Sequence, residues 1–164
     1  MNTQQNFAVN DYDKRNKLLL GSDAPVILDL FAYYKDNPRT PLTLWDEKVN
    51  NITPPDISNK PNIIRGNVLE PVVRDVLIPI FHPDIEVVED LNTYYSPDND
   101  FMACHIDGQV VGKKRLAEIK CPAFGPMTNW KRDGKYYLPD YVRAQCLHIL
   151  ACRPDIEGID VFAY

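Results

Sequence analysis

The sequence has few glycines and no long hydrophobic run. Seven glycines stand against 14 prolines in 164 residues, which favours rigid, proline-punctuated connections over flexible linkers. The longest uninterrupted apolar stretch is residues 76–81, far below the roughly 20 residues needed to span a bilayer, so we expect no membrane segment. Residues 1–10 are polar, without a basic start or an apolar centre. We therefore expect a flexible N-terminal segment rather than a secretory signal.

Basic residues are also fewer than acidic ones. The chain has 18 basic and 23 acidic residues, a net charge of −5. A protein that binds nucleic acid through its overall charge should be basic, so any DNA contact must be local. Acidic side chains that hold metal ions would themselves lower the net charge. The length, with 45% apolar and 25% charged residues, is typical of one globular domain and excludes disorder and collagen-like repeats. We expect that single domain to cover residues 11–164.

Several functional motifs are missing. No glycine-rich phosphate loop is present, which argues against an NTPase, and the three histidines lack the spacing of zinc ligands. The four cysteines are not paired as C-x-x-C, the spacing that iron–sulfur clusters often use. Without a secretory signal, they indicate reduced, buried thiols in a cytoplasmic protein. They are Cys104, Cys121, Cys146 and Cys152.

Apolar periodicity predicts helices in the first half of the chain. One begins with Ser22 as its N-cap, and a second begins at Thr40-Pro41 with Leu42, Trp45 and Val49 on one side. The longest covers residues 62 to about 81. Pro71 lies inside it and predicts a kink at Glu70.

Strand-like segments dominate the second half. They are residues 85–88, 94–95, 101–106, 116–119 and 158–164. Asp107-Gly108, together with Gly112, is expected to join the third and fourth of these as a hairpin, and a helix is expected from residue 138 or 139 to about 152. Helices, a meander of strands, a helix and a strand indicate an α+β fold, with a central mixed sheet flanked by helices.

The sharpest chemical signal is Asp107, followed eleven residues later by Glu118-Ile119-Lys120. If the two flanking strands are neighbours, both carboxylates meet at one end of the hairpin. Glu118 and Lys120 are two residues apart on a strand, so they share one face. Two carboxylates suit Mg²⁺, and a lysine can orient or deprotonate an attacking water. The alternative, which the spacing leaves open, is an ordinary solvated strand around a buried isoleucine.

Two further residues extend this site. Glu70, on the long helix, could bring a third carboxylate to the same metal; the alternative is a solvated helix residue before a proline. Gln145, on the late helix, can both donate and accept hydrogen bonds.

Six short motifs in order make a wider pattern. They are Gly21-Ser22-Asp23-Ala24, Thr40-Pro41-Leu42-x-Leu44-Trp45-x-x-Lys48, Arg65-Gly66-x-x-Leu69-Glu70-Pro71, Asp107-Gly108, Glu118-Ile119-Lys120-Cys121-Pro122 and Tyr141-x-x-x-Gln145. This pattern resembles the YqaJ-type viral recombinases, relatives of bacteriophage lambda exonuclease in the PD-(D/E)xK nuclease superfamily. The resemblance covers residues from about 15 to the C-terminus.

The resemblance implies a restriction-endonuclease-like core and a metal-dependent exonuclease. Such an enzyme digests one strand of linear double-stranded DNA from its 5′ end and passes the 3′ single-stranded tail to an annealing recombinase. By this resemblance, Asp107, Glu118 and the Ile119 backbone carbonyl would hold Mg²⁺, with Mn²⁺ as a substitute. Glu70 would complete the site and Lys120 would position the water. The expected location is the cytoplasm of a bacterium or phage-infected host.

The resemblance also implies a pocket for the 5′-terminal phosphate. Arg15, Ser22 and Gln145 stand at the matching positions, and Tyr141 belongs to the motif of Gln145. His105 replaces a hydroxyl that many relatives have two residues before the aspartate, so we expect an imidazole contact there.

The sequence departs from the family at its C-terminal end, where relatives usually continue with further strand and helix. We therefore expect a C-terminally minimal member whose homo-oligomeric state is open. Two alternatives remain: a catalytically silent DNA-binding or inhibitory module on a nuclease fold, and a Cas4-like iron–sulfur nuclease.

Overall fold

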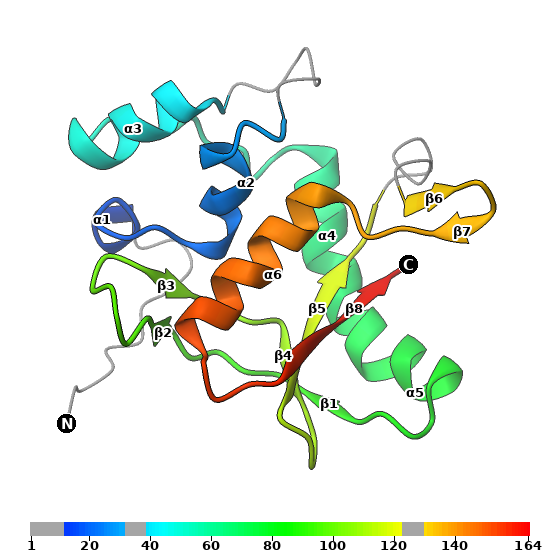
Figure 1. The fold of residues 1–164 in the computed structure, drawn as a ribbon. Coiled ribbons are helices and arrows are strands. Elements are labelled where there is room, and N and C mark those ends of the chain that lie inside the picture. The colour runs from blue at the N-terminus through cyan, green and yellow to red at the C-terminus, as the bar shows by residue number, and fades with distance from the viewer. Residues whose placement is uncertain (1–11, 32–38, 123–129) are drawn as a thin grey trace. The chain divides into compact units, whose positions relative to one another are not determined.

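The computed structural model describes residues 12–31, 39–122 and 130–164 (Figure 1). Contacts divide the chain into two compact units. The first unit comprises residues 1–54, 92–105 and 139–154, and the second comprises residues 55–91, 106–138 and 155–164. In the three described stretches, no helix has both the length and the hydropathy that a bilayer crossing requires. The predicted flexible segment, residues 1–10, lies outside the described residues.

The first unit is mainly helical. Its elements are α1 (Tyr12–Arg15), the 3₁₀ turn η1 (Gly21–Asp23), α2 (Ala24–Ile27), α3 (Pro41–Val49), α6 (Asp140–Cys152), and the short antiparallel pair β2 (Tyr94–Tyr95) and β3 (Ala103–Cys104). α6 is the longest of them, and its residues Val142, Cys146 and Ile149 are buried as their helical spacing predicts. The helix predicted for the end of the chain is therefore confirmed.

Local chemistry explains where α3 begins. Thr40 lies before the helix in an extended conformation, and its Oγ1 accepts a hydrogen bond from the Thr43 N–H at 3.2 Å. The Thr40 N–H in turn donates to the Thr43 hydroxyl at 2.8 Å, and Pro41 occupies the first helical turn. These contacts satisfy backbone groups that a helix start leaves without partners.

The prediction that Ser22 caps a helix is wrong. Ser22 is an exposed residue within η1, and the side chain that serves this turn belongs to Asp23. Its Oδ2 accepts a hydrogen bond from the Leu20 N–H at 3.0 Å. The sequence pattern missed this because Asp23 reaches backwards over three residues, a geometry that Ser22, one residue earlier, cannot share.

Asp23 also belongs to a buried ion cluster in the first unit. Arg39 donates to Asp23 at 2.7 Å and to Glu47 at 2.8 Å, and Lys48 lies 3.1 Å from Asp23. Both carboxylates are buried. Two acids therefore face two bases, an arrangement that buried charges require.

The second unit contains the larger sheet. Its helical segments are α4 (Pro61–Val72), the π-helical segment η2 (Val73–Leu77) and α5 (Ile78–Phe81), and its strands are β1 (Val87–Val88), β4 (Gly108–Val110), β5 (Arg115–Lys120), β6 (Lys131–Arg132), β7 (Lys135–Tyr136) and β8 (Gly158–Ala163). The sheet order is β1-β4-β5-β8, with β6 and β7 as a separate pair. β5 pairs antiparallel with β4 and parallel with β8, so the sheet is mixed as predicted (Figure 1).

The predicted hairpin is correct in one strand and wrong in the other. Residues 103–104 pair with β2, and β4 is the strand that pairs with β5. Asp107-Gly108 therefore lies at the start of β4, and the turn passes through Gly112, which has a φ of +70°. Glycine adopts that left-handed conformation without strain. The sequence did not show which segment pairs with β5, because so short a strand cannot be distinguished from a turn by its apolar pattern alone. Burial in the folded chain decides which segment becomes the paired strand.

The long predicted helix forms in three segments. Pro71 lies inside α4, and the break predicted at Glu70 comes slightly later, as the π-helical segment Val73–Leu77. Proline lacks an N–H and so removes one α-helical hydrogen bond, but the chain accommodates it without ending the helix.

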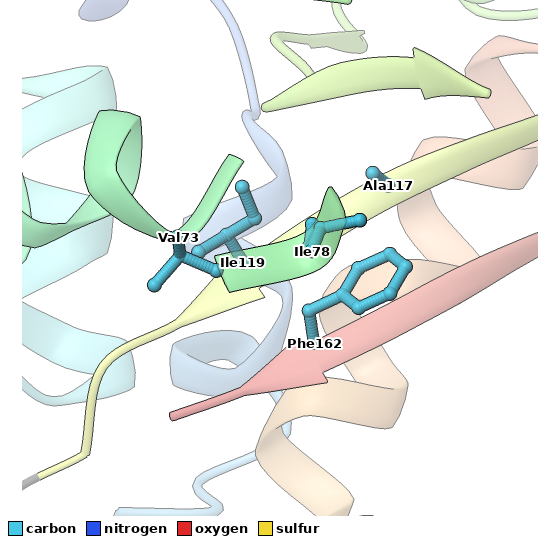
Figure 2. Packing of buried hydrophobic residues seen from close by; sticks show 5 residues of the cluster. All are labelled: Val73, Ile78, Ala117, Ile119 and Phe162. Atoms are coloured by element: carbon cyan, nitrogen blue, oxygen red, sulfur yellow. The ribbon is translucent and has the colours of Figure 1, made fainter. Parts of the chain in front are cut away.

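The segment after the break covers the sheet. Val73 and Ile78 pack against Ala117 and Ile119 of β5 and Phe162 of β8, as Figure 2 shows. All five side chains are buried. This cluster holds the helical segment that follows Glu70 against the strand that carries Glu118 and Lys120.

Candidate active site

Strand pairing brings Asp107 next to β5. Gly108 is the register partner of Ala117, so Asp107, one residue earlier, lies beside the Glu118 end of that strand. Its Oδ2 accepts a hydrogen bond from the Ile119 N–H at 2.7 Å. The two carboxylates of the sequence pattern therefore meet, through a different strand from the one predicted.

Glu118 and Lys120 lie on the same face of β5. The Lys120 Nζ is 2.5 Å from the Glu118 Oε1, and the Glu118 side chain is almost fully buried while Lys120 is partly exposed. A carboxylate at this depth is stable only with a charged partner or a proton. The short ion pair shows that the Lys120 ammonium group lies directly beside the Glu118 carboxylate.

Glu70 approaches from α4. Burial raises its pKa, and the nearby Asp107 carboxylate raises it further. The helix is attached to the end of β5 by Arg65, whose Nη2 donates to the Cys121 carbonyl at 2.8 Å. The third carboxylate of the predicted set therefore lies close enough to interact with the other two: Asp107 raises the pKa of Glu70, and Glu70 raises the pKa of Glu118.

The site is short of positive charge. Burial raises the pKa of Glu118 to about 7, with Asp107 as the next cause, and burial also raises the pKa of Asp107. Clustered carboxylates raise one another's pKa values because each disfavours the charged form of its neighbours. A hard divalent cation with oxygen ligands would relieve this repulsion, so the donor set fits Mg²⁺.

The described residues do not form a closed metal cluster. No three His, Cys, Asp or Glu side chains among them are grouped as metal ligands. Two of the expected donors are engaged elsewhere: Asp107 with the Ile119 N–H and Glu118 with Lys120. The predicted contact through the Ile119 carbonyl remains a prediction.

Arg74 is a site neighbour that the sequence analysis missed. It is a buried arginine one helical turn after Glu70, and it forms ion pairs with Asp75 at 2.9 Å and Glu89 at 3.1 Å. Its charge lowers the pKa of both Glu70 and Asp107. The spacing of four residues from Glu70 could have revealed it, because such residues are neighbours on a helix.

The five residues expected at the phosphate pocket all belong to the first unit, and two of them lie near each other. A Cβ atom added at Gly21 would lie 3.4 Å from the Gln145 Cγ, so Gln145 packs against the turn that carries Ser22. Tyr141, one turn earlier on α6, packs against Phe31 with the rings tilted and 5.5 Å between their centroids.

His105 and Arg15 also influence each other. Burial and the nearby Arg15 charge lower the pKa of His105. Its Nε2 is 2.9 Å from the Thr93 Oγ1, and Thr93 is fully buried. The imidazole is therefore held in place, and its neutral form is favoured in the absence of an anion.

The four cysteines are free thiols, and Cys104, Cys146 and Cys152 are buried as expected, whereas Cys121 is partly exposed. The first three belong to the first unit and Cys121 to the second. Hydrogen bonds from Cys104 and His148 lower the pKa of Cys152 to about 6.

Comparisons with known proteins identify a family and a similar fold. The sequence model of the YqaJ-like viral recombinase domain matches residues 12–153. The alkaline exonuclease LHK-Exo from Laribacter hongkongensis has a similar fold, with a TM-score of 0.63 and 18% identity over 93% of this chain and 72% of that one. Its complex with dAMP gives a TM-score of 0.62 and 19% identity over 93% and 71%. No curated protein matches the sequence.

Proposed function

Because the chain belongs to the YqaJ-like viral recombinase domain family, we propose that it is a Mg²⁺-dependent exonuclease. It degrades one strand of linear double-stranded DNA from the 5′ end and leaves a 3′ single-stranded tail. Family membership supports a DNA nuclease in general. The observation that supports this particular chemistry is the group of three carboxylates around Lys120, with a Glu118 pKa raised to about 7.

Asp107 and Glu118 would hold the metal, with Glu70 completing the set and the Ile119 carbonyl as a further ligand. A bound divalent cation would neutralise charge on the scissile phosphate and lower the pKa of a coordinated water. Mn²⁺, which also accepts oxygen ligands, would substitute.

Lys120 would orient the attacking water and accept its proton. Its Nζ lies beside Glu118 at 2.5 Å, so the ammonium would lie within reach of a water on a metal that Glu118 holds. A neighbouring metal charge would favour the neutral amine, which can take a proton. Glu118 would keep the lysine side chain extended toward the phosphate rather than toward solvent.

Arg15, Ser22, His105, Gln145 and Tyr141 would recognise the 5′ end. An arginine provides a planar pair of donors suited to a terminal phosphate. Gln145 packs against the turn carrying Ser22, and the Arg15 charge is close enough to lower the pKa of His105. The 3′ tail would pass to a single-strand annealing recombinase, and assembly into a homo-oligomer is part of the same proposal.

Digestion of end-labelled linear duplex DNA tests the proposal. We expect nucleotides to be released from the 5′-phosphorylated strand with Mg²⁺ or Mn²⁺, and no release with a chelator. Glu118→Gln is the matched variant, since it keeps the shape of the side chain and removes the ligand charge. Hydrolysis that continues in chelator would contradict the metal site.

Two other results would contradict the function in different ways. End binding without hydrolysis under every metal condition would favour a catalytically silent DNA-binding module. Hydrolysis from the 3′ end, or equal cleavage of circular DNA, would preserve a nuclease but reject the proposed direction or the need for an end.

A further inference from the structure

The first unit contains a cavity that the proposed chemistry does not use. It has a volume of about 440 Å³ and lies beside α3, between that helix and residues 16–19. Apolar side chains form most of its lining, including Trp45, Phe101, Ile27 and Val49. A cavity of this size and character is typical of a small-ligand site.

The apolar lining is not ordinary core. The face of α3 that was predicted to be apolar is exposed: Trp45 is 52% exposed and Val49 61%, and the buried residue that anchors the helix is Leu44. Phe101, on the other side of the cavity, is 49% exposed. Two large aromatic side chains left half in water at one cavity indicate a surface that a ligand covers.

The charged side chains that line the cavity are all basic. Lys17 and Lys48 are the charged residues of its lining, and no carboxylate lies among the lining residues, although the chain as a whole has a net charge of −5. Lys48 already contacts Asp23 at 3.1 Å and the Arg15 carbonyl at 2.7 Å. Lys17 is exposed, so it is the cation available to an anionic ligand.

Aromatic surface beside a lysine is the arrangement that proteins use for single-stranded nucleic acid, because every unpaired base offers a flat face next to a phosphate. We propose that this cavity binds an unpaired base of single-stranded DNA, which contacts Trp45 and Phe101 while Lys17 lies near the adjoining phosphate. A duplex keeps its bases stacked inside, so it cannot fill the cavity. The choice of DNA as the ligand rests on the proposed function.

Tryptophan fluorescence measures this binding directly. The chain has two tryptophans, so Trp130→Phe leaves Trp45 as the only reporter. Titration in chelator with an oligothymidylate of about 12 nucleotides, within the usual site sizes, should quench Trp45 fluorescence and saturate. Chelator prevents metal-dependent cleavage, so binding is measured separately from activity.

Matched variants locate the contact. In the same background, Phe101→Ala should weaken oligothymidylate binding about tenfold, the usual effect of losing one stacking side chain. Lys17→Ala should weaken it a few-fold and reduce the slope of log affinity against log salt by about 0.7. Leu42→Ala is the control, because Leu42 is on the same helix, is 69% exposed and does not line the cavity. Its binding should be unchanged.

Three results would overturn the proposal. An abasic oligonucleotide that binds as tightly and quenches equally would show backbone binding without a base in the cavity. Equal quenching by duplex DNA would show that no unpaired base is needed. Quenching by an amphipathic helical peptide, with none by oligothymidylate, would assign the cavity to a protein partner.

The two proposals fail separately. Saturable quenching of Trp45 without any metal-dependent digestion would reject the nuclease function and support the base-binding cavity. Digestion of duplex ends by a protein whose Trp45 fluorescence does not respond to oligothymidylate would support the function and reject the cavity site.

Discussion

Each unit contains a cluster of acidic and basic side chains, and the two clusters differ in their charge balance. The first contains Asp23, Glu47, Arg39 and Lys48, and the second contains Glu70, Asp107, Glu118 and Lys120. In the first, two carboxylates face two cations at 2.7–3.1 Å. In the second, three carboxylates surround one lysine, and the remaining nearby cation, Arg74, is shared with Asp75 and Glu89.

This difference separates a cluster whose charges balance one another from a cluster that a bound cation would stabilise. A balanced cluster is complete without a ligand, so its purpose is to hold the chain in place. A cluster with excess negative charge is unstable without a proton or a cation. Burial, followed by the charge of Asp107, raises the pKa of Glu118 to about 7, and this favours the protonated form of that carboxyl. Burial alone does not distinguish them, since Asp23 and Glu118 are equally buried.

The largest expected effect tests the second cluster. Lys120→Ala should lower the rate of duplex digestion by about 10³-fold, typical of a lost proton-transfer group, because the lysine acts on the water and not on the ground state. Single-turnover cleavage of a 5′-labelled duplex measures the chemical step, and fluorescence anisotropy measures the affinity for DNA ends. Together they separate the effect on cleavage from the effect on binding.

Lys114→Ala is the matched control, since Lys114 is exposed in the turn before β5. Its cleavage rate should stay near wild type. A Lys120→Ala protein that cleaves at a near-normal rate would mean that Lys120 is a solvated strand lysine.

The second effect tests the first cluster. Asp23→Ala should lower the free energy of unfolding by about 3 kcal/mol, because it leaves Arg39 and Lys48 without their shared partner. It also removes the hydrogen bond to the Leu20 N–H. Urea denaturation followed by circular dichroism gives the change.

Asp29→Ala provides the comparison, since Asp29 is an exposed residue a few positions further along the chain. Asp29 has a positive φ of 52°, which aspartate tolerates better than alanine, so this substitution should cause a small loss of stability. If both substitutions cost the same, the ion cluster contributes nothing specific.

A third effect concerns DNA ends. Arg15→Ala should reduce the preference for 5′-phosphorylated over 5′-hydroxyl ends about tenfold, which is the usual contribution of a charge-assisted pair, about 1.4 kcal/mol. The measurement is the ratio of digestion rates on the two kinds of end. Equal rates on both ends in the wild type would remove the phosphate pocket and leave the carboxylate cluster intact.

The smallest effect is on stability, and it depends on pH. The folded-state pKa of Glu118 is raised from 4.5 to about 7, so its stabilising contribution is complete below about pH 4.5 and is lost as the pH rises through 7. In chelator, Glu118→Gln should therefore equal wild type near pH 5 and exceed it by on the order of 1 kcal/mol near pH 8.

Urea denaturation at the two pH values measures this difference, and Glu86→Gln, at an exposed position before β1, is the control. If the free energy of unfolding falls equally between pH 5 and pH 8 in wild type and Glu118→Gln, then Glu118 is not the group whose ionisation destabilises the folded protein. Added Mg²⁺ should stabilise the wild type at pH 8 more than Glu118→Gln.

Much of the site could be predicted because its residues lie close together in the chain. Glu118 and Lys120 share a face of one strand, and that follows from the two-residue repeat alone. Their partner Asp107 was placed correctly beside them even though the hairpin was assigned to residues 101–106. The wrong strand assignment did not change the position predicted for Asp107, because Asp107 borders both the predicted and the observed strand.

Other features depended on contacts far apart in sequence. Leu42, Trp45 and Val49 share one side of α3 as their spacing predicts, but that side is exposed, and Leu44 is the buried residue. A helix pattern shows which residues share a face, whereas the neighbours in space decide whether that face is covered.

The sequence by itself determined most of the helical segments, the strand that carries Glu118 and Lys120 on one face, and the family motifs, because these depend on backbone periodicity and residue type over a few positions. Only the tertiary structure decided that β4 is the partner of β5, that Asp23 is neutralised by Arg39 and Lys48, and that Glu118 is buried deeply enough to raise its pKa to about 7. The physical reason is that strand partners, charge balance and burial depend on which distant segments exclude water from the same place.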